Sequence, residues 1–119
     1  MNQPHVQRTM GIQNDLIDST ISYLELRKNN RVTELVNMCS DNIVIDSERD
    51  GIFRGKDEVA SYYTNNKAVK GEWDQPYQTD TRTVVVTGRV YFLFMTFHIK
   101  ATFDFNIIGK IVKITIRRL

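Results

Sequence analysis

The sequence predicts an α+β protein, and two observations support this class. Up to about residue 66, apolar residues recur at helical spacing, whereas from Trp73 onward they alternate with polar residues as in strands. Helices followed by a run of strands are typical of a domain whose helices pack on one face of a curved, mostly antiparallel sheet. At 119 residues the chain can bury one core without disulfides or metal, so we expect one domain at 13–119 after a tail at 1–12.

Three segments in the first half are predicted to be helices. The segment "DLIDSTISYLELRKNN" (15–30) has a wide apolar stripe and ends at two asparagines, and "RVTELVNMC" (31–39) repeats the same period. The third helix begins at Gly55, where two acidic residues suit the positive end of the helix dipole, and it ends at "TNN" (64–66).

The sequence signals for the strands are less regular than those for the helices. A brief β-branched strand, "IVID" (43–46), lies between the second and third helices. In the second half, Thr87-Gly88 and Gly109 are each predicted to be hairpin turns, because glycine adopts the positive φ of a tight turn. The run between Arg89 and Asn106 is too long for one strand, so we also expect a bend or turn near residues 95–98.

Composition excludes several classes of protein. The hydrophobic content of 41% and the charged content of 25% are ordinary for a globular domain, and no apolar run approaches a membrane span. The net charge of +2 comes from scattered basic residues, so neither a nucleic acid nor a membrane is an expected partner. The one cysteine, Cys39, cannot form an intrachain disulfide, which favours a cytoplasmic location.

The sequence offers no pattern for a cofactor or a metal. No His/Cys/Asp/Glu spacing is typical of a metal site, and there is no glycine-rich phosphate loop. Cys39 is expected to be buried on the second helix rather than to act as a nucleophile, and His98 alternates with apolar neighbours and should point away from the interior. We therefore expect no cofactor and no metal.

Nearly the whole chain carries a family resemblance. A helical pair, "SDNIVID", a short gap to "FRGKDEVASYY" and a strand-rich half that ends in "FDFNIIGKIVKI" resemble the nuclear transport factor 2-like superfamily. Within the superfamily, the chain is most similar to the SnoaL-like and ketosteroid isomerase branch. The resemblance implies a cone-shaped α+β barrel, in which a strongly curved sheet wraps a long helix and leaves an apolar pocket open at one end.

The resemblance also implies roles for particular residues. Aligned without gaps over residues 40–65, Asp46 lies at the position of the general-base aspartate, and Tyr63 at that of a tyrosine that supports the oxyanion hole. A base of this kind gains basicity by desolvation in an apolar pocket. The isomerase's oxyanion donors are a tyrosine and a carboxylic acid. Their positions hold Ser22, with Tyr23 adjacent, and Ala101, so the carboxylic donor is absent.

Each of these residues also has a structural interpretation. Asp46 is either a pocket acid with a raised pKa or an exposed acid at the end of a strand. The predicted ligand-binding residues are aromatic, and most of them could equally be core residues with a hydroxyl at a wet edge. They are Tyr23, Tyr62, Tyr63, Trp73 and Phe103.

Three functions remain open from the sequence. The protein could be a small enzyme that acts by proton transfer (an isomerase, cyclase or dehydratase with Asp46 as base), or a module that binds an apolar metabolite without turnover. It could also be an association module resembling a transport factor. We further expect a homodimer formed through the outer face of the sheet. In the inferred alternation that face carries His98, Lys100, Thr102, Asp104, Lys113, Thr115 and Arg117.

Overall fold

The computed structural model describes residues 4–119, with side chains from Asp15 onward. Three helices precede most of the strands, in the order α1 (Pro4–Lys28), α2 (Val32–Asn37), β1 (Cys39–Ser47), β2 (Gly51–Arg54), α3 (Gly55–Asn65), β3 (Gly71–Trp73), β4 (Tyr77–Asp80), β5 (Thr83–Phe92), β6 (Met95–Phe105) and β7 (Ile111–Arg118). The predicted tail at 1–12 lies partly outside the described residues, and from Pro4 its backbone belongs to α1.

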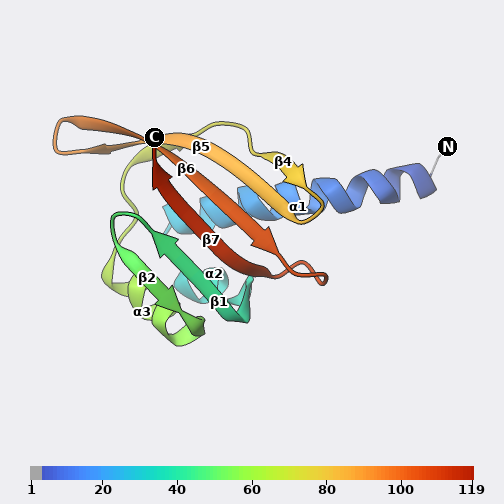
Figure 1. The fold of residues 1–119 in the computed structure, drawn as a ribbon, viewed down its shortest axis with the longest axis horizontal. Helices are drawn as coiled ribbons and strands as arrows, with labels where there is room; N and C mark the ends of the chain where they lie inside the picture. Colours follow the sequence, from blue (N-terminus) through green and yellow to red (C-terminus); the bar gives the residue numbers. More distant parts are fainter. Residues whose placement is uncertain (1–3) are drawn as a thin grey trace.

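The strands form one mixed sheet in the order β2-β1-β7-β6-β5-β3, and β4 also pairs with β5. Only β1 and β7 are parallel, and the other described pairs are antiparallel. The sheet is curled but not closed, and α1 crosses one of its faces (Figure 1). The predicted α+β class and its cone-shaped architecture are therefore confirmed.

The helices pack against the sheet through the predicted stripes. In α1, Leu16, Thr20 and Tyr23 share one buried face, and the Thr20 hydroxyl donates to the Leu16 carbonyl at 2.9 Å. In α3, buried Val59 is followed one turn later by Tyr62 and Tyr63. The sheet contributes the rest of the core, which includes Ile43, Ile45, Val84, Val86, Ala101, Phe103, Phe105, Ile111 and Ile114.

One of the two predicted hairpin turns is wrong. Gly109 has a φ of +87° and lies in the turn between β6 and β7, as expected. Gly88, in contrast, lies inside the continuous strand β5. A Cβ at Gly88 would come within 2.7 Å of the Trp73 ring, so this glycine permits the close approach of β3 and does not form a turn.

The turn of the β5–β6 hairpin lies at Leu93-Phe94, just before the predicted region at 95–98. Both residues have positive φ, 57° and 77°, as a two-residue loop of the primed type requires. Neither residue is of a type that favours this backbone, so the sequence carries no local signal for the turn. The hairpin end projects beyond the rest of the sheet (Figure 1).

Two further boundaries differ from the prediction. α2 ends at Asn37, so Cys39 begins β1 instead of lying on a helix, although it is buried as expected. The short strand β2 was not predicted. It pairs antiparallel with β1, with Ser47 opposite Gly51 at the turn.

Candidate functional site

A large pocket of about 1400 Å³ lies between the helices and the inner face of the sheet. Alternate residues of β6 and β7 point inward and give the pocket an apolar wall on the side of the sheet. The apolar wall from these two strands consists of Phe97, Ile99, Ala101, Phe103, Ile114 and Ile116, and Arg118 lines the pocket at the end of β7. A smaller hollow of about 670 Å³, near α1 and the β6–β7 turn, is lined partly by exposed residues such as Asp15, Asp18 and Ile107.

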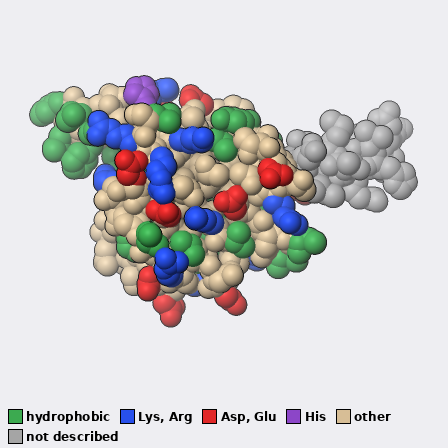
Figure 2. All heavy atoms as spheres, viewed as in Figure 1, with side chains coloured by type: hydrophobic (Ala, Val, Ile, Leu, Met, Phe, Trp, Pro, Cys, Tyr) green, Lys and Arg blue, Asp and Glu red, His purple; other side chains and the backbone are tan. Residues whose placement is uncertain are grey.

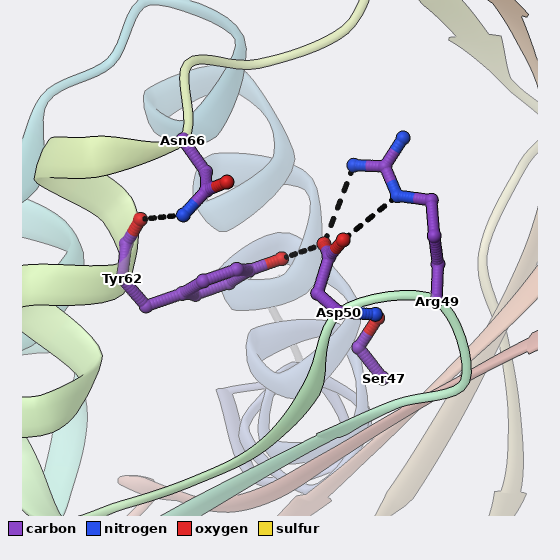
Figure 3. Close-up of polar contacts among 5 residues, drawn as sticks. All are labelled: Ser47, Arg49, Asp50, Tyr62 and Asn66. Atoms are coloured by element: carbon purple, nitrogen blue, oxygen red, sulfur yellow. Dashed lines mark hydrogen bonds and ion pairs between the residues drawn. The ribbon is translucent and has the colours of Figure 1, made fainter.

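A polar cluster lies on one side of the large pocket, where the β1–β2 turn meets α3 (Figure 3). The Tyr62 hydroxyl donates to Asp50 Oδ2 at 2.6 Å. Arg49 donates to both carboxylate oxygens of Asp50, at 2.8 and 3.3 Å, and the Asp50 amide donates to the Ser47 hydroxyl at 3.1 Å. Asp50 is thus held by three donor hydrogen bonds at the edge of the pocket.

The polar cluster shifts the pKa values of Asp50 and Tyr62. Burial raises the pKa of the Asp50 carboxyl, but the hydrogen bonds from Arg49 and Tyr62 outweigh burial, and the pKa ends below its ordinary value. Burial, reinforced by the Asp50 carboxylate, raises the pKa of Tyr62 to about 12. At neutral pH Asp50 is therefore a charged acceptor and Tyr62 a neutral donor.

Arg27 brings a second cation to the same side of the pocket. It projects from the last turn of α1, and its guanidinium lies 4.6 Å from the centre of the Tyr63 ring and 5.9 Å from that of Tyr62. Burial lowers the pKa of Arg27, and Tyr62 and Asp50 oppose this shift. At neutral pH the group stays charged.

Two further tyrosines close the inner end of the pocket. The hydroxyls of Tyr23 and Tyr63 contact each other, which satisfies both buried groups. The Tyr23 ring packs edge-on against Phe103, with ring centres 5.4 Å apart. Burial raises the pKa of Tyr63 well above its ordinary value, so its hydroxyl stays neutral.

Solved structures with a similar fold were found at low sequence identity. A nuclear transport factor 2-like protein of unknown function from Cytophaga hutchinsonii superposes with a TM-score of 0.75 at 10% identity, over 87% of this chain and 89% of that one. An uncharacterised cystatin-fold protein from Novosphingobium aromaticivorans has a TM-score of 0.74 at 16% identity, over 87% and 97%. The chain has the nuclear transport factor 2-like fold.

Another protein similar in structure is SalBIII, described as an epoxide hydrolase/cyclase-like enzyme in pyran ring formation in the polyether salinomycin. Its TM-score is 0.74 at 14% identity, over 89% of this chain and 92% of that one. No protein-family model and no curated protein matches the sequence. The similarity therefore establishes the nuclear transport factor 2-like fold and leaves the activity to be argued from the pocket.

Within this fold, all five predicted ligand-binding residues line the pocket. Tyr23 comes from α1, Tyr62 and Tyr63 come from α3, and Phe103 comes from β6. Trp73, at the end of β3, is 37% exposed and packs against Gly88. That they bind a ligand remains a prediction.

The prediction that Asp46 faces the pocket with a raised pKa is wrong. Ile45 and Ser47 are fully or nearly buried on the inner side of β1, so Asp46 between them points outward. Its carboxylate accepts from Arg117 Nη2 at 3.0 Å, and this hydrogen bond lowers the pKa of Asp46. Asp46 therefore has the structural role of pairing with β7 on the outer face.

The remaining expectations from the sequence concern membrane-spanning helices, metal sites and the residues His98 and Cys39. Among the described residues, no helix is both long and apolar enough to cross a membrane, and no cluster of described His, Cys, Asp and Glu side chains could hold a metal ion. His98 is exposed, and burial raises the pKa of the Cys39 thiol to about 11, which makes it a poor nucleophile at neutral pH.

Sequence reasoning missed the charged residues beside Tyr62 and Tyr63, which are Arg27, Arg49 and Asp50 and are among several charged residues of the pocket lining. Asp50 lies in a turn, where no periodicity indicates the direction of a side chain. Arg27 resembles the basic residues that commonly end helices. The one available signal is the spacing of Tyr23 and Arg27, which are one helical turn apart and so share the inner face of α1.

Proposed function

We propose that the protein binds a small, largely apolar molecule in the pocket between the helices and the sheet. The observation that carries this proposal is a pocket of about 1400 Å³ with an apolar wall from β6 and β7 and polar groups that include Arg27, Asp50 and Tyr62. Ligand pockets generally combine such walls with a few polar groups that orient the ligand. A cytoplasmic location stays a prediction from the sequence.

Binding is favoured over catalysis because Asp50, the acid of the polar cluster, is poorly suited to accept a proton. A general base works best when its pKa lies near the working pH, whereas the pKa of Asp50 is lowered. Asp46, which the family resemblance offered as the base of an isomerase, cyclase or dehydratase, lies on the outer face. The ring-forming chemistry described for SalBIII would need another acid or base here.

A neutral fluorescent dye tests the binding proposal. Trp73 is the one tryptophan and lies at the pocket, so a dye such as N-phenylnaphthylamine should quench it by energy transfer and bind with a stoichiometry of one. Ala101→Leu fills part of the pocket and should weaken binding, whereas Thr102→Leu, on the opposite face of β6, should not. Equal affinity in both variants, or no binding, would contradict the proposal.

Self-association is a second candidate, and one observation favours it. The tip of the β5–β6 hairpin exposes four large apolar side chains, Phe92, Leu93, Phe94 and Met95, and hydrophobic side chains gather at that end of the molecule (Figure 2). The predicted outer-face residues, such as His98 and Lys100, lie along the next part of β6. A second copy could cover both surfaces at once.

Light scattering at micromolar concentration tests this candidate. A dimer requires a mass near twice 13.9 kDa, and the double variant Leu93→Asn/Phe94→Gly should lower the dimer fraction. Because Asn-Gly favours this turn, the variant should keep the hairpin intact. A wild-type mass of 13.9 kDa that does not change on concentration would exclude the dimer.

A further inference from the structure

Arg27 lines the pocket without a carboxylate of its own. Its guanidinium lies against the rings of Tyr62 and Tyr63, and no acid forms an ion pair with it among the described residues. Its Nη1 is buried and has no hydrogen-bond partner in the described part of the chain. A donor left in this state destabilises a protein unless something else supplies an acceptor.

The acid of the polar cluster, Asp50, is already engaged. Asp50 accepts two hydrogen bonds from Arg49 and one from Tyr62, so its charge and most of its acceptor positions are used. Two cations, Arg27 and Arg49, therefore share one carboxylate at this side of the pocket. The charges of Arg27, Arg49 and Asp50 sum to one unit positive before any ligand binds, and other charged residues, such as Glu48 and Arg118, line the rest of the pocket.

We propose that the pocket selects amphipathic ligands that carry a single negative charge, with a carboxylate bound by Arg27 and an apolar body against β6 and β7. This inference rests on the proposed binding function and names the ligand class. The planar guanidinium fork matches the two oxygens of a carboxylate, and rotation of its terminal torsions can turn Nη1 toward the pocket. A doubly charged phosphate fits less well, because Asp50 would repel the second charge.

The wild-type protein can test the charge requirement with two ligands of equal chain length. Decanoate below its micellar concentration and decanol below its solubility limit displace bound N-phenylnaphthylamine, and the ratio of their affinities measures the contribution of the carboxylate. A charge-assisted hydrogen bond predicts that decanoate binds about tenfold more tightly than decanol. Equal affinities, or tighter binding of decanol, would overturn the inference.

Substitutions of Arg27 test whether this residue causes the preference for decanoate over decanol. Arg27→Met keeps the length of the side chain and its packing on Tyr63 but removes the charge, so the preference for decanoate should fall to near one. Arg27→Lys keeps the charge without the fork and should give an intermediate ratio. Arg31→Met is the matched control, since Arg31 pairs with Glu34 at an exposed site outside the pocket lining. An unchanged preference in Arg27→Met would also overturn the inference.

The experiment separates this inference from the binding proposal on which it rests. If the neutral dye does not bind, the proposed function fails. If the dye binds but decanoate shows no advantage, only the ligand class fails. Circular dichroism of each variant checks folding, and the wild-type comparison of decanoate with decanol does not depend on any variant.

Discussion

Asp46 and Asp50 are close in the sequence, and both pair with an arginine, yet they occupy opposite sides of the sheet. Asp46 lies on the outer face of β1 and accepts from Arg117 at 3.0 Å. Asp50 lies in the following turn, faces the pocket and accepts from Arg49 and from the Tyr62 hydroxyl. An alignment with the isomerase branch selects the first aspartate, whereas the structure places the second one at the pocket.

The difference shows that a matching position does not fix the direction of a side chain. Successive residues of a strand point to opposite faces, so a shift of one residue exchanges the interior and exterior sets. In β1 the inner set is Ile43, Ile45 and Ser47, which leaves Asp46 outside. The turn after Ser47 breaks this alternation and brings Asp50 back over the pocket.

Replacement of each aspartate by asparagine should separate the two sites most clearly. Asp50→Asn loses the charge-assisted hydrogen bonds to Arg49 and Tyr62, and after allowance for partial exposure we expect it to destabilise the protein by about 1–2 kcal/mol. Asp46→Asn removes one partly exposed ion pair with Arg117 and no hydrogen bond from a buried tyrosine, so it should cost distinctly less. Urea unfolding of both variants measures the difference, and equal losses would contradict the assignment of Asp50 to a structured pocket cluster.

The hydroxyl of Tyr62 should have the next largest effect. Tyr62→Phe removes the donor to Asp50 but keeps the ring stacked on Phe53, where the ring centres are 4.2 Å apart. We expect a loss of about 1 kcal/mol in the free energy of unfolding, the usual net value of one hydrogen bond. In the Asp50→Asn background the same change should cost less, because the charged acceptor is gone, and a double-mutant cycle measures this coupling.

The pH dependence of the free energy of unfolding should also distinguish Asp50→Asn from the wild type. The folded-state pKa of Asp50 is below its unfolded value, so its contribution is fully present above about pH 4 and is lost as the pH falls through the folded-state pKa. As the pH falls in the acidic range, the free energy of unfolding should therefore decrease less steeply in Asp50→Asn than in the wild type. Urea midpoints at several acidic pH values measure these slopes, and a wild-type slope in Asp50→Asn would count against the lowered pKa.

Much of the fold could be predicted because its signals are periodic. The stripe that contains Leu16, Thr20 and Tyr23 predicts α1 correctly, and the alternation of Ala101 and Phe103 predicts the inner face of β6. The turn predicted at Gly88 is wrong because glycine is also found where a ring packs closely on a strand, as the Trp73 ring does here. Nothing in the pair Leu93-Phe94 indicates a turn, since its positive φ is set by the pairing of β5 with β6.

The candidate site was predictable only in its apolar part. The aromatic pocket residues occur at positions where the period of an element is clear. Ile43, Val44 and Ile45 are all apolar, so the alternation that would have placed Asp46 outside is not visible in the sequence. Arg49 and Asp50 lie in a turn, and their orientation follows from the pairing of β1 with β2 rather than from local preference.

The smallest expected effect is that of Asp46 on the pocket itself. Asp46 and Arg117 form their ion pair on the outer face, and neither residue lines the pocket. Asp46→Asn should therefore leave the affinity for N-phenylnaphthylamine unchanged and keep the ratio of decanoate to decanol affinities at its wild-type value.

Asp50→Asn leaves the positive charge of Arg27 and Arg49 without its counter-charge, so it should increase the preference for decanoate by a fewfold or more. Dye displacement with both variants provides the measurement. If Asp46→Asn changed the decanoate preference as much as Asp50→Asn, the charge on the outer face would influence ligand binding, and the distinction between the two aspartates would not hold.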